Sequence, residues 1–114
     1  MKVVFIAGPF RAATPWQVEE NVRAAERVAL DIWRLGAAAL CPHTNTRFFD
    51  KVLSDDVFLA GTRELLRRCD AMYIIGDWLS SHGTHAELDF ARAYDIPVFH
   101  DYQALARWLQ TMTA

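Results

Sequence analysis

Four short apolar runs in this sequence are separated by longer amphipathic segments, and this alternation constrains the fold more than any other feature. The runs cover residues 3–7, 37–41, 71–75 and 97–99. Short continuous apolar runs are typical of strands buried on both faces. The segments between them repeat apolar residues every three or four positions, which predicts helices. We therefore expect an α/β fold, a flavodoxin-like or Rossmann-like three-layer α/β/α sandwich with a four- to five-stranded parallel sheet.

Capping residues predict where the helices begin and end. Thr14 precedes Pro15, as in an N-cap followed by proline in the first helical position, and Gly36 ends this first helix. The later helices are expected, in chain order, from Ser54 or Asp55 to Arg67-Arg68, from Gly83 to Tyr94, and after the cap Asp101. The segment from His43 to Leu53 has neither a helical nor a strand period, so we expect a loop there.

Charge and length exclude several classes of protein. The 114 residues include 12 Lys and Arg against 14 Asp and Glu, a formal net charge of −2, whereas generic binders of nucleic acid or anionic membranes need a basic face. The length suits one domain over residues 1–114. No apolar run is long enough for a bilayer span or a signal peptide, and two cysteines fit a reducing compartment. We therefore expect a cytoplasmic protein that binds neither nucleic acid nor membrane.

Polar loops follow the predicted strands at their carboxyl ends, where parallel sheets bind ligands. They cover residues 8–11, 42–47 and 77–84. The strongest signal is Ser81-x-Gly83-Thr84 at a helix start, because backbone N–H groups, hydroxyls and the positive helix end suit an anion such as a nucleotide phosphate. Glu87 follows about one turn later and can attack an electrophilic carbon held by that loop. The alternative is that Ser81 only caps the helix and Glu87 complements its dipole, worth about 0.3–1 kcal/mol.

Other residues of these loops are candidates for ligand contacts. Gly8 and Pro9 come directly off the first strand, where glycine allows close approach of a ligand, and Arg11 can pair with a phosphate or carboxylate. An ordinary turn with a solvated arginine is the alternative. The spacing matches neither a dinucleotide-binding motif nor a P-loop. His43 and Asn45, in a Pro-His-Thr-Asn segment, are expected to line the wall of a pocket.

Two aspartates flank the third predicted strand. Asp77 follows the strand and is expected either to contact the base or sugar of a ligand or to face solvent. Asp70 precedes the strand, and the alternatives are a supporting role at the site or a turn at the end of a helix. Only Asp77 is at the carboxyl end, where ligands bind.

The sequence predicts no metal and no cofactor. His85-x-Glu87 is similar to half of the zinc motif of nucleobase deaminases, but no Pro-Cys-x-x-Cys follows it. Cys41 is two residues from His43, which allows a catalytic pair, but a buried structural cysteine is the interpretation we favour.

Two motifs together resemble the nucleoside 2-deoxyribosyltransferase superfamily, which includes the nucleoside 5′-monophosphate N-glycosidases. They are Phe5-Ile6-Ala7-Gly8-Pro9-Phe10-Arg11 and, with Asp70 ahead of an apolar strand, Ser81-x-Gly83-Thr84-x-x-Glu87. The resemblance covers residues 2–99. It is nearest to a small branch of domains of unknown function, DUF4406-like, that carries a similar Pro-His-Thr-Asn segment.

The resemblance implies roles for individual residues. Glu87 occupies the position of the family's nucleophile. The other implied roles are 5′-phosphate binding for Ser81 and Gly83 and nucleotide contact for Gly8 and Arg11. One position departs from the pattern, because Thr62 stands where the monophosphate glycosidases carry an aspartate. This departure bears on turnover.

The implied function is an enzyme that acts on the N-glycosidic bond of nucleosides or nucleoside 5′-monophosphates through a Glu87 glycosyl-enzyme intermediate. The alternative is a non-catalytic nucleotide-binding or sensor module of the same fold. A chain of 114 residues leaves little material for a lid, and in the resembling family another subunit completes the site. We therefore expect a homo-oligomer, a dimer or dimer-based assembly with a shared active site, in which Trp16 and Trp78 are candidate anchors.

Overall fold

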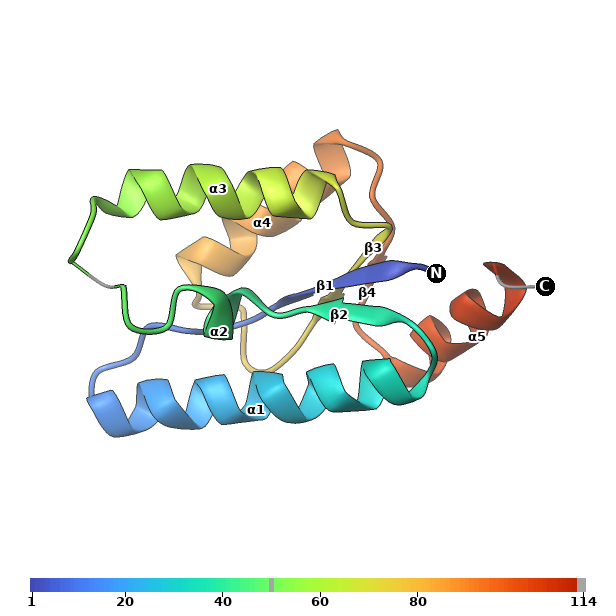
Figure 1. Cartoon of the computed structure of the whole chain (residues 1–114), viewed down its shortest axis with the longest axis horizontal. Helices are drawn as coiled ribbons and strands as arrows, with labels where there is room; N and C mark the ends of the chain where they lie inside the picture. Colours follow the sequence, from blue (N-terminus) through green and yellow to red (C-terminus); the bar gives the residue numbers. More distant parts are fainter. Residues whose placement is uncertain (50, 113–114) are drawn as a thin grey trace.

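A four-stranded parallel sheet forms the centre of the computed structural model, which describes residues 1–49 and 51–112 (Figure 1). Its strand order is β2-β1-β3-β4, with β1 at Val3–Ala7, β2 at Ala38–Leu40, β3 at Ala71–Ile74 and β4 at Val98–Phe99. The predicted α/β fold class is confirmed. The chain leaves β1 toward β2 on one side and reaches β3 on the other, so the switch point of the topology lies between β1 and β3.

Five helices are described, and they cover both faces of the sheet as a flavodoxin-like sandwich requires (Figure 1). They are α1 (Pro15–Arg34), α2 (Pro42–Asn45), α3 (Asp55–Arg67), α4 (His82–Ala93) and α5 (Tyr102–Met112). Helices α1 and α5 pack on one face, and α3 and α4 pack on the other. None of the helices described has the length and apolar character needed to span a membrane.

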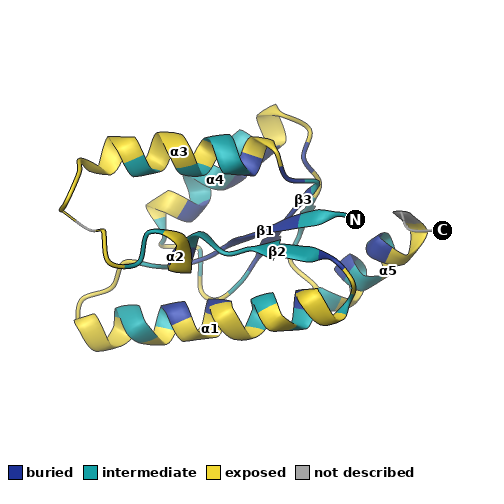
Figure 2. Cartoon of the chain, viewed as in Figure 1, coloured by how far each residue is buried: buried dark blue, intermediate teal, exposed yellow. Residues whose placement is uncertain are grey.

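The core is divided by the sheet into two apolar clusters. Successive residues of β1 point to opposite faces, so Val4 belongs to the cluster under α1 and α5, whereas Phe5 belongs to the cluster under α3 and α4. Figure 2 shows the buried residues concentrated in the strands and on the inward sides of the helices. All four residues of β3 are buried. This two-sided burial explains why the strands lack a polar alternation in the sequence.

The predicted helix caps are present at three of the helices. Thr14 accepts a hydrogen bond from the Gln17 N–H, and the Gln17 side chain accepts one from the Thr14 N–H, which completes a capping box. Asp101 accepts from the N–H of Ala104 at the start of α5. Ser54 is the N-cap residue of α3, although its side chain makes no capping hydrogen bond.

The segment after β2 differs from the expected loop, because Pro42 begins a short helix. Proline fits the first position of a helix, where its fixed φ is already helical and its missing N–H is not needed. The N–H and the hydroxyl of Thr44 both donate to the Cys41 carbonyl, at 3.2 and 3.0 Å. This single turn, α2, is too short to produce a hydrophobic period in the sequence.

Candidate functional site

Three loops meet at the carboxyl edge of the sheet, on the left of Figure 1. They are the β1–α1 loop, the β2–α2 junction and the β3–α4 loop. This is the edge at which the sequence placed the candidate residues, and it is the usual ligand-binding edge of a parallel sheet.

Gly8 follows β1 at the switch point and is buried between strands. A Cβ atom there would lie 2.7 Å from Cγ1 and 2.9 Å from the carbonyl oxygen of Ile75. The Ile75 N–H donates to the carbonyl of Ala7 at 2.9 Å, which holds the two chain segments together. Glycine is thus required by the close approach of the neighbouring strand.

His43 lies beneath the β1–α1 loop instead of along an open pocket wall. The residue is only 6% exposed, and its Nε2–H donates to the Pro9 carbonyl at 2.9 Å. The Phe10 ring meets it edge-on with centroids 5.8 Å apart. Burial lowers the pKa of His43, although the backbone carbonyls at Pro9 and Gly8 favour the protonated ring. The neutral imidazole therefore ties α2 to the loop that carries Pro9.

Arg11 is held at the surface by an ion pair with the first residue of α3. Its guanidinium lies 2.7 Å from the carboxylate of Asp55, and both side chains are exposed. Exposed pairs of this kind hold a side chain only weakly. Arg11 can therefore exchange Asp55 for another anion at the carboxyl edge.

The predicted hydroxyl pair caps α4. Ser81 Oγ accepts from the Thr84 N–H at 3.3 Å and lies 2.8 Å from Thr84 Oγ1, and Thr84 is 1% exposed. If the Thr84 hydroxyl donates to Ser81, the hydroxyl proton of Ser81 stays available to a ligand. Gly83 is exposed, with no atom near the position of a Cβ. The helix start therefore presents one hydroxyl and free backbone N–H groups of the kind every helix N-terminus offers.

Glu87 is the sixth residue of α4 after its cap and lies on the helix face that covers the sheet. Thr84, Leu88 and Ala91 on this face are buried, and Glu87 follows Thr84 by three residues and precedes Ala91 by four. Burial raises the pKa of Glu87 to about 8, although the charge of Arg63 on α3 opposes the shift. Within residues 1–49 and 51–112 no hydrogen bond or ion pair reaches this carboxyl group.

A pocket of about 150 Å³, open to solvent, lies between the end of α2 and α3. It brings together Asn45, a predicted contact residue, and Thr62, the position that departs from the resembling family. The other lining residues are Thr46, Val57, Phe58, Gly61 and Leu65. The sequence did not single these out, since α3 shows only the apolar spacing that any packed helix has. Helix α3 in turn packs against α4, which carries Glu87.

The two candidate aspartates lie at opposite edges of the sheet. Asp70 is at the amino end of β3, where its carboxylate accepts a 2.7 Å hydrogen bond from the Val3 N–H. The length of β3, about 13 Å for four residues, separates it from the loops. Asp70 therefore joins the starts of two strands, which corrects the supporting role expected of it. Asp77 is exposed in the β3–α4 loop, directly after Gly76.

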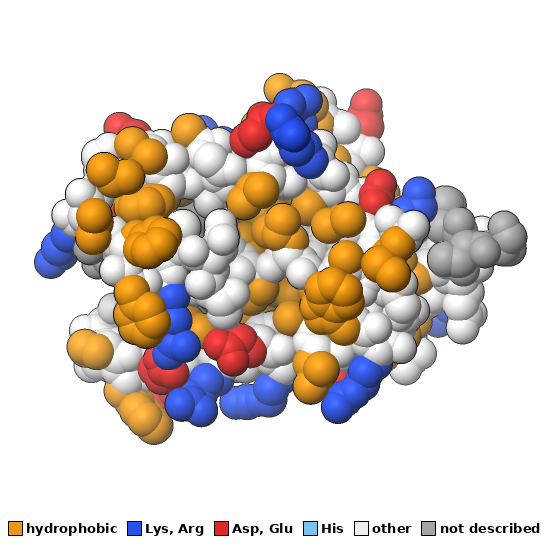
Figure 3. Space-filling view, in the orientation of Figure 1, with side chains coloured by type: hydrophobic (Ala, Val, Ile, Leu, Met, Phe, Trp, Pro, Cys, Tyr) orange, Lys and Arg blue, Asp and Glu red, His pale blue; other side chains and the backbone are white. Residues whose placement is uncertain are grey.

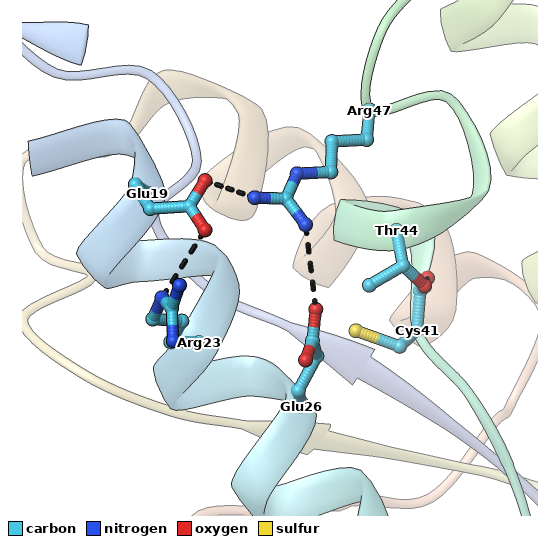
Figure 4. A network of polar contacts seen from close by, with 6 residues as sticks. All are labelled: Glu19, Arg23, Glu26, Cys41, Thr44 and Arg47. Atoms are coloured by element: carbon cyan, nitrogen blue, oxygen red, sulfur yellow. Dashed lines mark hydrogen bonds and ion pairs between the residues drawn. The ribbon is translucent and has the colours of Figure 1, made fainter. Parts of the chain in front are cut away.

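An ion-pair network beside the β1–α1 loop was missed by the sequence analysis (Figure 4). Arg47, after α2, reaches down to α1, where it forms a short hydrogen-bonded pair with Glu19 and lies 3.8 Å from Glu26. Arg47 lowers the pKa of Glu19, and so does Arg23, which forms a second ion pair with Glu19. A groove of about 370 Å³ beside the pair is lined by Ala12, Ala13, Thr14, Pro15, Val18, Glu19, Val22, Arg47 and Phe48.

The remaining candidate chemistries find no support in the described residues. Burial raises the pKa of Cys41, and it raises the pKa of Cys69 to about 11, so both thiols are protonated at neutral pH. In residues 1–49 and 51–112, no three or more His, Cys, Asp or Glu side chains lie close enough to hold a metal ion. His85, from the half-motif, instead bonds the Leu79 carbonyl at 2.7 Å and packs on Trp78.

The sheet order and the polar loops at its carboxyl edge define a Rossmann-like α/β domain with a candidate ligand site at the switch point. The profile of the family "Domain of unknown function (DUF7768)" matches residues 2–101, and the chain belongs to this family. The DUF4406-like branch expected from the motifs is thus corrected to the DUF7768 family.

One similar solved structure is that of a 2-deoxyribosyltransferase from the psychrotolerant bacterium Bacillus psychrosaccharolyticus. It superposes with a TM-score of 0.66 at 21% sequence identity, over 84% of this chain and 69% of the other. The chain thus has the nucleoside 2-deoxyribosyltransferase-like fold that the motifs implied. A comparison with curated proteins gives no match.

Proposed function

We propose that this protein is an enzyme of the N-glycosidic bond, acting on nucleosides or nucleoside 5′-monophosphates with Glu87 as nucleophile. The observation that carries the proposal is the state of the Glu87 carboxyl, which is partly buried on α4 beside Thr84, Leu88 and Ala91 and has no hydrogen-bond or ion-pair partner among the described residues. A buried carboxyl without partners destabilises a fold, and such groups concentrate at functional sites. The helix dipole does not account for Glu87, because its effect is confined to the first turn.

The proposed reaction has two steps. The Glu87 carboxylate attacks the anomeric carbon, the carbon–nitrogen bond breaks, and its electron pair leaves with the base, which takes a proton from solvent. The positive charge that develops on the sugar in the transition state is stabilised by the adjacent carboxylate. Water then attacks the glycosyl ester and regenerates Glu87, giving hydrolysis, or a second base attacks and gives transfer.

The remaining candidates have supporting roles in this proposal. The N-terminus of α4, with Ser81 and Gly83, receives a 5′-phosphate, because its hydroxyl and backbone N–H groups donate to anions. Arg11 exchanges Asp55 for the same ligand, and Asp77 contacts its sugar or base. Asn45 faces the ligand from the cavity between α2 and α3. His43 and Pro9 act indirectly, since their hydrogen bond positions the loop.

A second candidate function is a non-catalytic nucleotide-binding module. The observation that favours it is Thr62, which lines the cavity between α2 and α3 with a hydroxyl in place of a carboxylate. A pocket without this second acid can still bind a nucleotide, but it lacks one group for assisting the sugar or the leaving base.

Incubation with a panel of nucleosides and nucleoside 5′-monophosphates, followed by chromatography for free base, tests both candidates. We expect base release by the wild-type protein and by Asp89→Asn, an exposed control on the same helix, but not by Glu87→Gln. An added acceptor base separates transfer from hydrolysis. A raised melting temperature with a nucleotide, without base release, would leave only the binding module. Release by Glu87→Gln at the wild-type rate would contradict the mechanism.

A further inference from the structure

The β1–α1 loop is held to the rest of the protein at three consecutive residues. Gly8 packs closely against the neighbouring strand, and a Cβ atom at Gly76 would lie 3.3 Å from Cδ of Pro9, so the Pro9 ring packs on the chain that leaves β3. The φ of Gly76 is +70°, a conformation that favours glycine. The third residue is Phe10, whose carbonyl accepts a hydrogen bond from the side-chain amide of Asn21 at 3.2 Å. Asn21 thus reaches from α1 back to the loop that precedes this helix.

Asn21 is an unusual residue for the interior of a helix. It is the seventh residue of α1, where asparagine is a weaker helix former than alanine or leucine because its side chain competes for nearby backbone groups. The residue is half-buried next to the core residue Val22, and its amide is bonded to the loop. A carbonyl oxygen only accepts hydrogen bonds, so the amide nitrogen of Asn21 is the donor to Phe10. The contact with the loop therefore accounts for a polar side chain at this position.

A second side chain holds the carbonyl of the preceding residue. His43 of α2 donates to the Pro9 carbonyl at 2.9 Å, and its ring also contacts the ring of Phe10. Among residues 1–49 and 51–112, no other donor reaches the carbonyls of Pro9 and Phe10. Two consecutive carbonyls of one loop are therefore bonded to two different helices, by Asn21 from α1 and by His43 from α2.

The side chains on the outer side of the loop do not replace these two hydrogen bonds. Figure 3 shows hydrophobic side chains gathered at this end of the molecule, over the α2–α3 connection and the start of α1. Phe48 is 82% exposed and lines the groove of about 370 Å³ together with Ala12 and Ala13. Hydrocarbon side chains have no hydrogen-bond donor. The conformation of the loop backbone therefore depends on the donors beneath it.

The same two hydrogen bonds orient the N–H groups of the loop. In a trans peptide the N–H of one residue points away from the carbonyl of the residue before it, and no cis peptide bond occurs in the described part of the chain. The N–H of Phe10 is thus turned away from His43, and the N–H of Arg11 is turned away from Asn21. Neither N–H has a hydrogen-bond partner within the residues that the structure describes. Both are available to a ligand at the carboxyl edge of the sheet.

We propose that Asn21 is a positioning residue, which holds the β1–α1 loop in the conformation that binds the substrate. The inference rests on the proposed function and adds to it a residue outside the candidate loops. A loop that is already ordered loses less conformational entropy when the ligand binds. Without Asn21 only a fraction of the molecules has the competent loop, and the apparent Kd rises by the inverse of that fraction. Glu87 is carried by α4, so the chemical step itself is unchanged.

The test compares Asn21→Leu with Glu20→Gln, an exposed control on the same helix. Leucine is similar in size to asparagine, has no donor and is the better helix former, so α1 is retained. We expect Asn21→Leu to raise the KM for base release about three- to tenfold, the range for the loss of one neutral hydrogen bond. The kcat should stay within about twofold, as it does when only binding is lost.

Binding measured by calorimetry with the common ribonucleoside and deoxyribonucleoside 5′-monophosphates should show the same rise in Kd for Asn21→Leu. The variant Asn21→Gln keeps the amide on a longer side chain and should recover part of the loss, whereas Glu20→Gln should match the wild type. Rescue by the amide separates the hydrogen bond from the packing of the side chain.

A measurement without ligand tests the contact independently of the proposed function. NMR relaxation of the backbone amides of Phe10 and Arg11 should give order parameters near about 0.85 in the wild type, the value of rigid backbone, and about 0.6 or less in Asn21→Leu. The amides of β3 serve as the internal reference and should keep their order parameters. This readout requires neither catalysis nor a bound nucleotide.

Two results would overturn the positioning role. One is a set of order parameters that does not change in Asn21→Leu, because the loop is then held without Asn21. The other is a wild-type protein that binds or cleaves nucleotides while Asn21→Leu has the same KM and Kd, or loses kcat alone. A wild-type protein that neither binds nor cleaves any nucleotide would overturn the proposed function instead, and the order parameters would still decide whether Asn21 holds the loop.

Discussion

Helices α1 and α4 both begin at the carboxyl edge of the sheet, and each carries a glutamate in its second turn, but the two carboxyl groups meet opposite environments. Glu19 on α1 is paired with Arg47 and Arg23, and these partners lower its pKa. Glu87 on α4 is partly buried without a comparable partner, and desolvation raises its pKa to about 8. The two glutamates occupy nearly the same position in their helices, so the difference between their pKa values comes from the neighbouring elements. The paired carboxylate of Glu19 links α1 to the segment after α2, whereas the unpaired carboxyl of Glu87 is the candidate for a function.

The largest expected difference between the two glutamates is in catalysis. Glu87→Gln should lower kcat at least about 10³-fold, roughly 4 kcal/mol of barrier, because an amide cannot replace the nucleophilic carboxylate. Glu19→Gln should change kcat less than about tenfold, since Glu19 only anchors Arg47. The rates are measured by base release from a substrate that the wild-type protein cleaves. Equal losses in both variants would point to a structural cause.

The next difference is in the pH dependence of stability. The Glu87 pKa is about 8 in the folded protein against an ordinary value of 4.5, so the folded state binds the proton more tightly. The contribution of this proton to the free energy of unfolding is complete below the ordinary pKa of 4.5 and is lost as the pH rises through about 8. The free energy of unfolding of Glu87→Gln should therefore rise by about 2–4 kcal/mol relative to that of the wild type between pH 4 and pH 9.

Urea denaturation across this pH range measures that gain, with Asp89→Asn as the exposed control on the same helix. The control should follow the wild-type curve. A difference between Glu87→Gln and wild type that does not vary with pH would mean that Glu87 ionises as freely in the folded chain as in the unfolded one.

A smaller effect, about tenfold per pH unit, is expected in the rate profile. The nucleophile must be ionised, so kcat/KM should rise with pH up to about 8 and then level off, as the pKa of Glu87 requires. Below that value the ionised fraction falls about tenfold for each pH unit. A profile that falls through the same pKa would instead identify the protonated carboxyl as the active form, acting as a general acid.

The smallest effect is expected on the melting temperature when the ion pair of Glu19 is removed. Arg47→Ala removes the partner of Glu19 and should lower the melting temperature by a small amount that shrinks in high salt, because partly exposed ion pairs are screened. Arg23→Ala, which removes only the exposed partner of Glu19, is the control and should change it less. A large loss of stability in Arg47→Ala would show that the fold depends on the link that Arg47 makes between α1 and the segment after α2.

Local sequence patterns predicted most of the fold because they depend on near neighbours. The apolar run Val3–Ala7 became the central strand β1, and Thr14 and Asp101 cap the helices expected to follow them. The spacing of Glu87 behind Ser81 also placed it correctly on a helix that starts at the carboxyl edge. The loop expected from His43 was wrong at its start, where α2 forms, since a one-turn helix has no period to detect.

The sequence alone determined the strands, the four longer helices and the edge at which the candidate residues gather. Caps and periodicity act over a few residues, and the right-handed crossovers place the carboxyl ends of the strands at one edge. Only the tertiary structure decided which charged groups are paired. Arg47 meets Glu19 across 28 positions of the chain, Asp70 bonds Val3 at the far edge, and no partner reaches Glu87 among the residues described. Burial and pairing depend on residues distant in the chain, so they arise only when the layers pack.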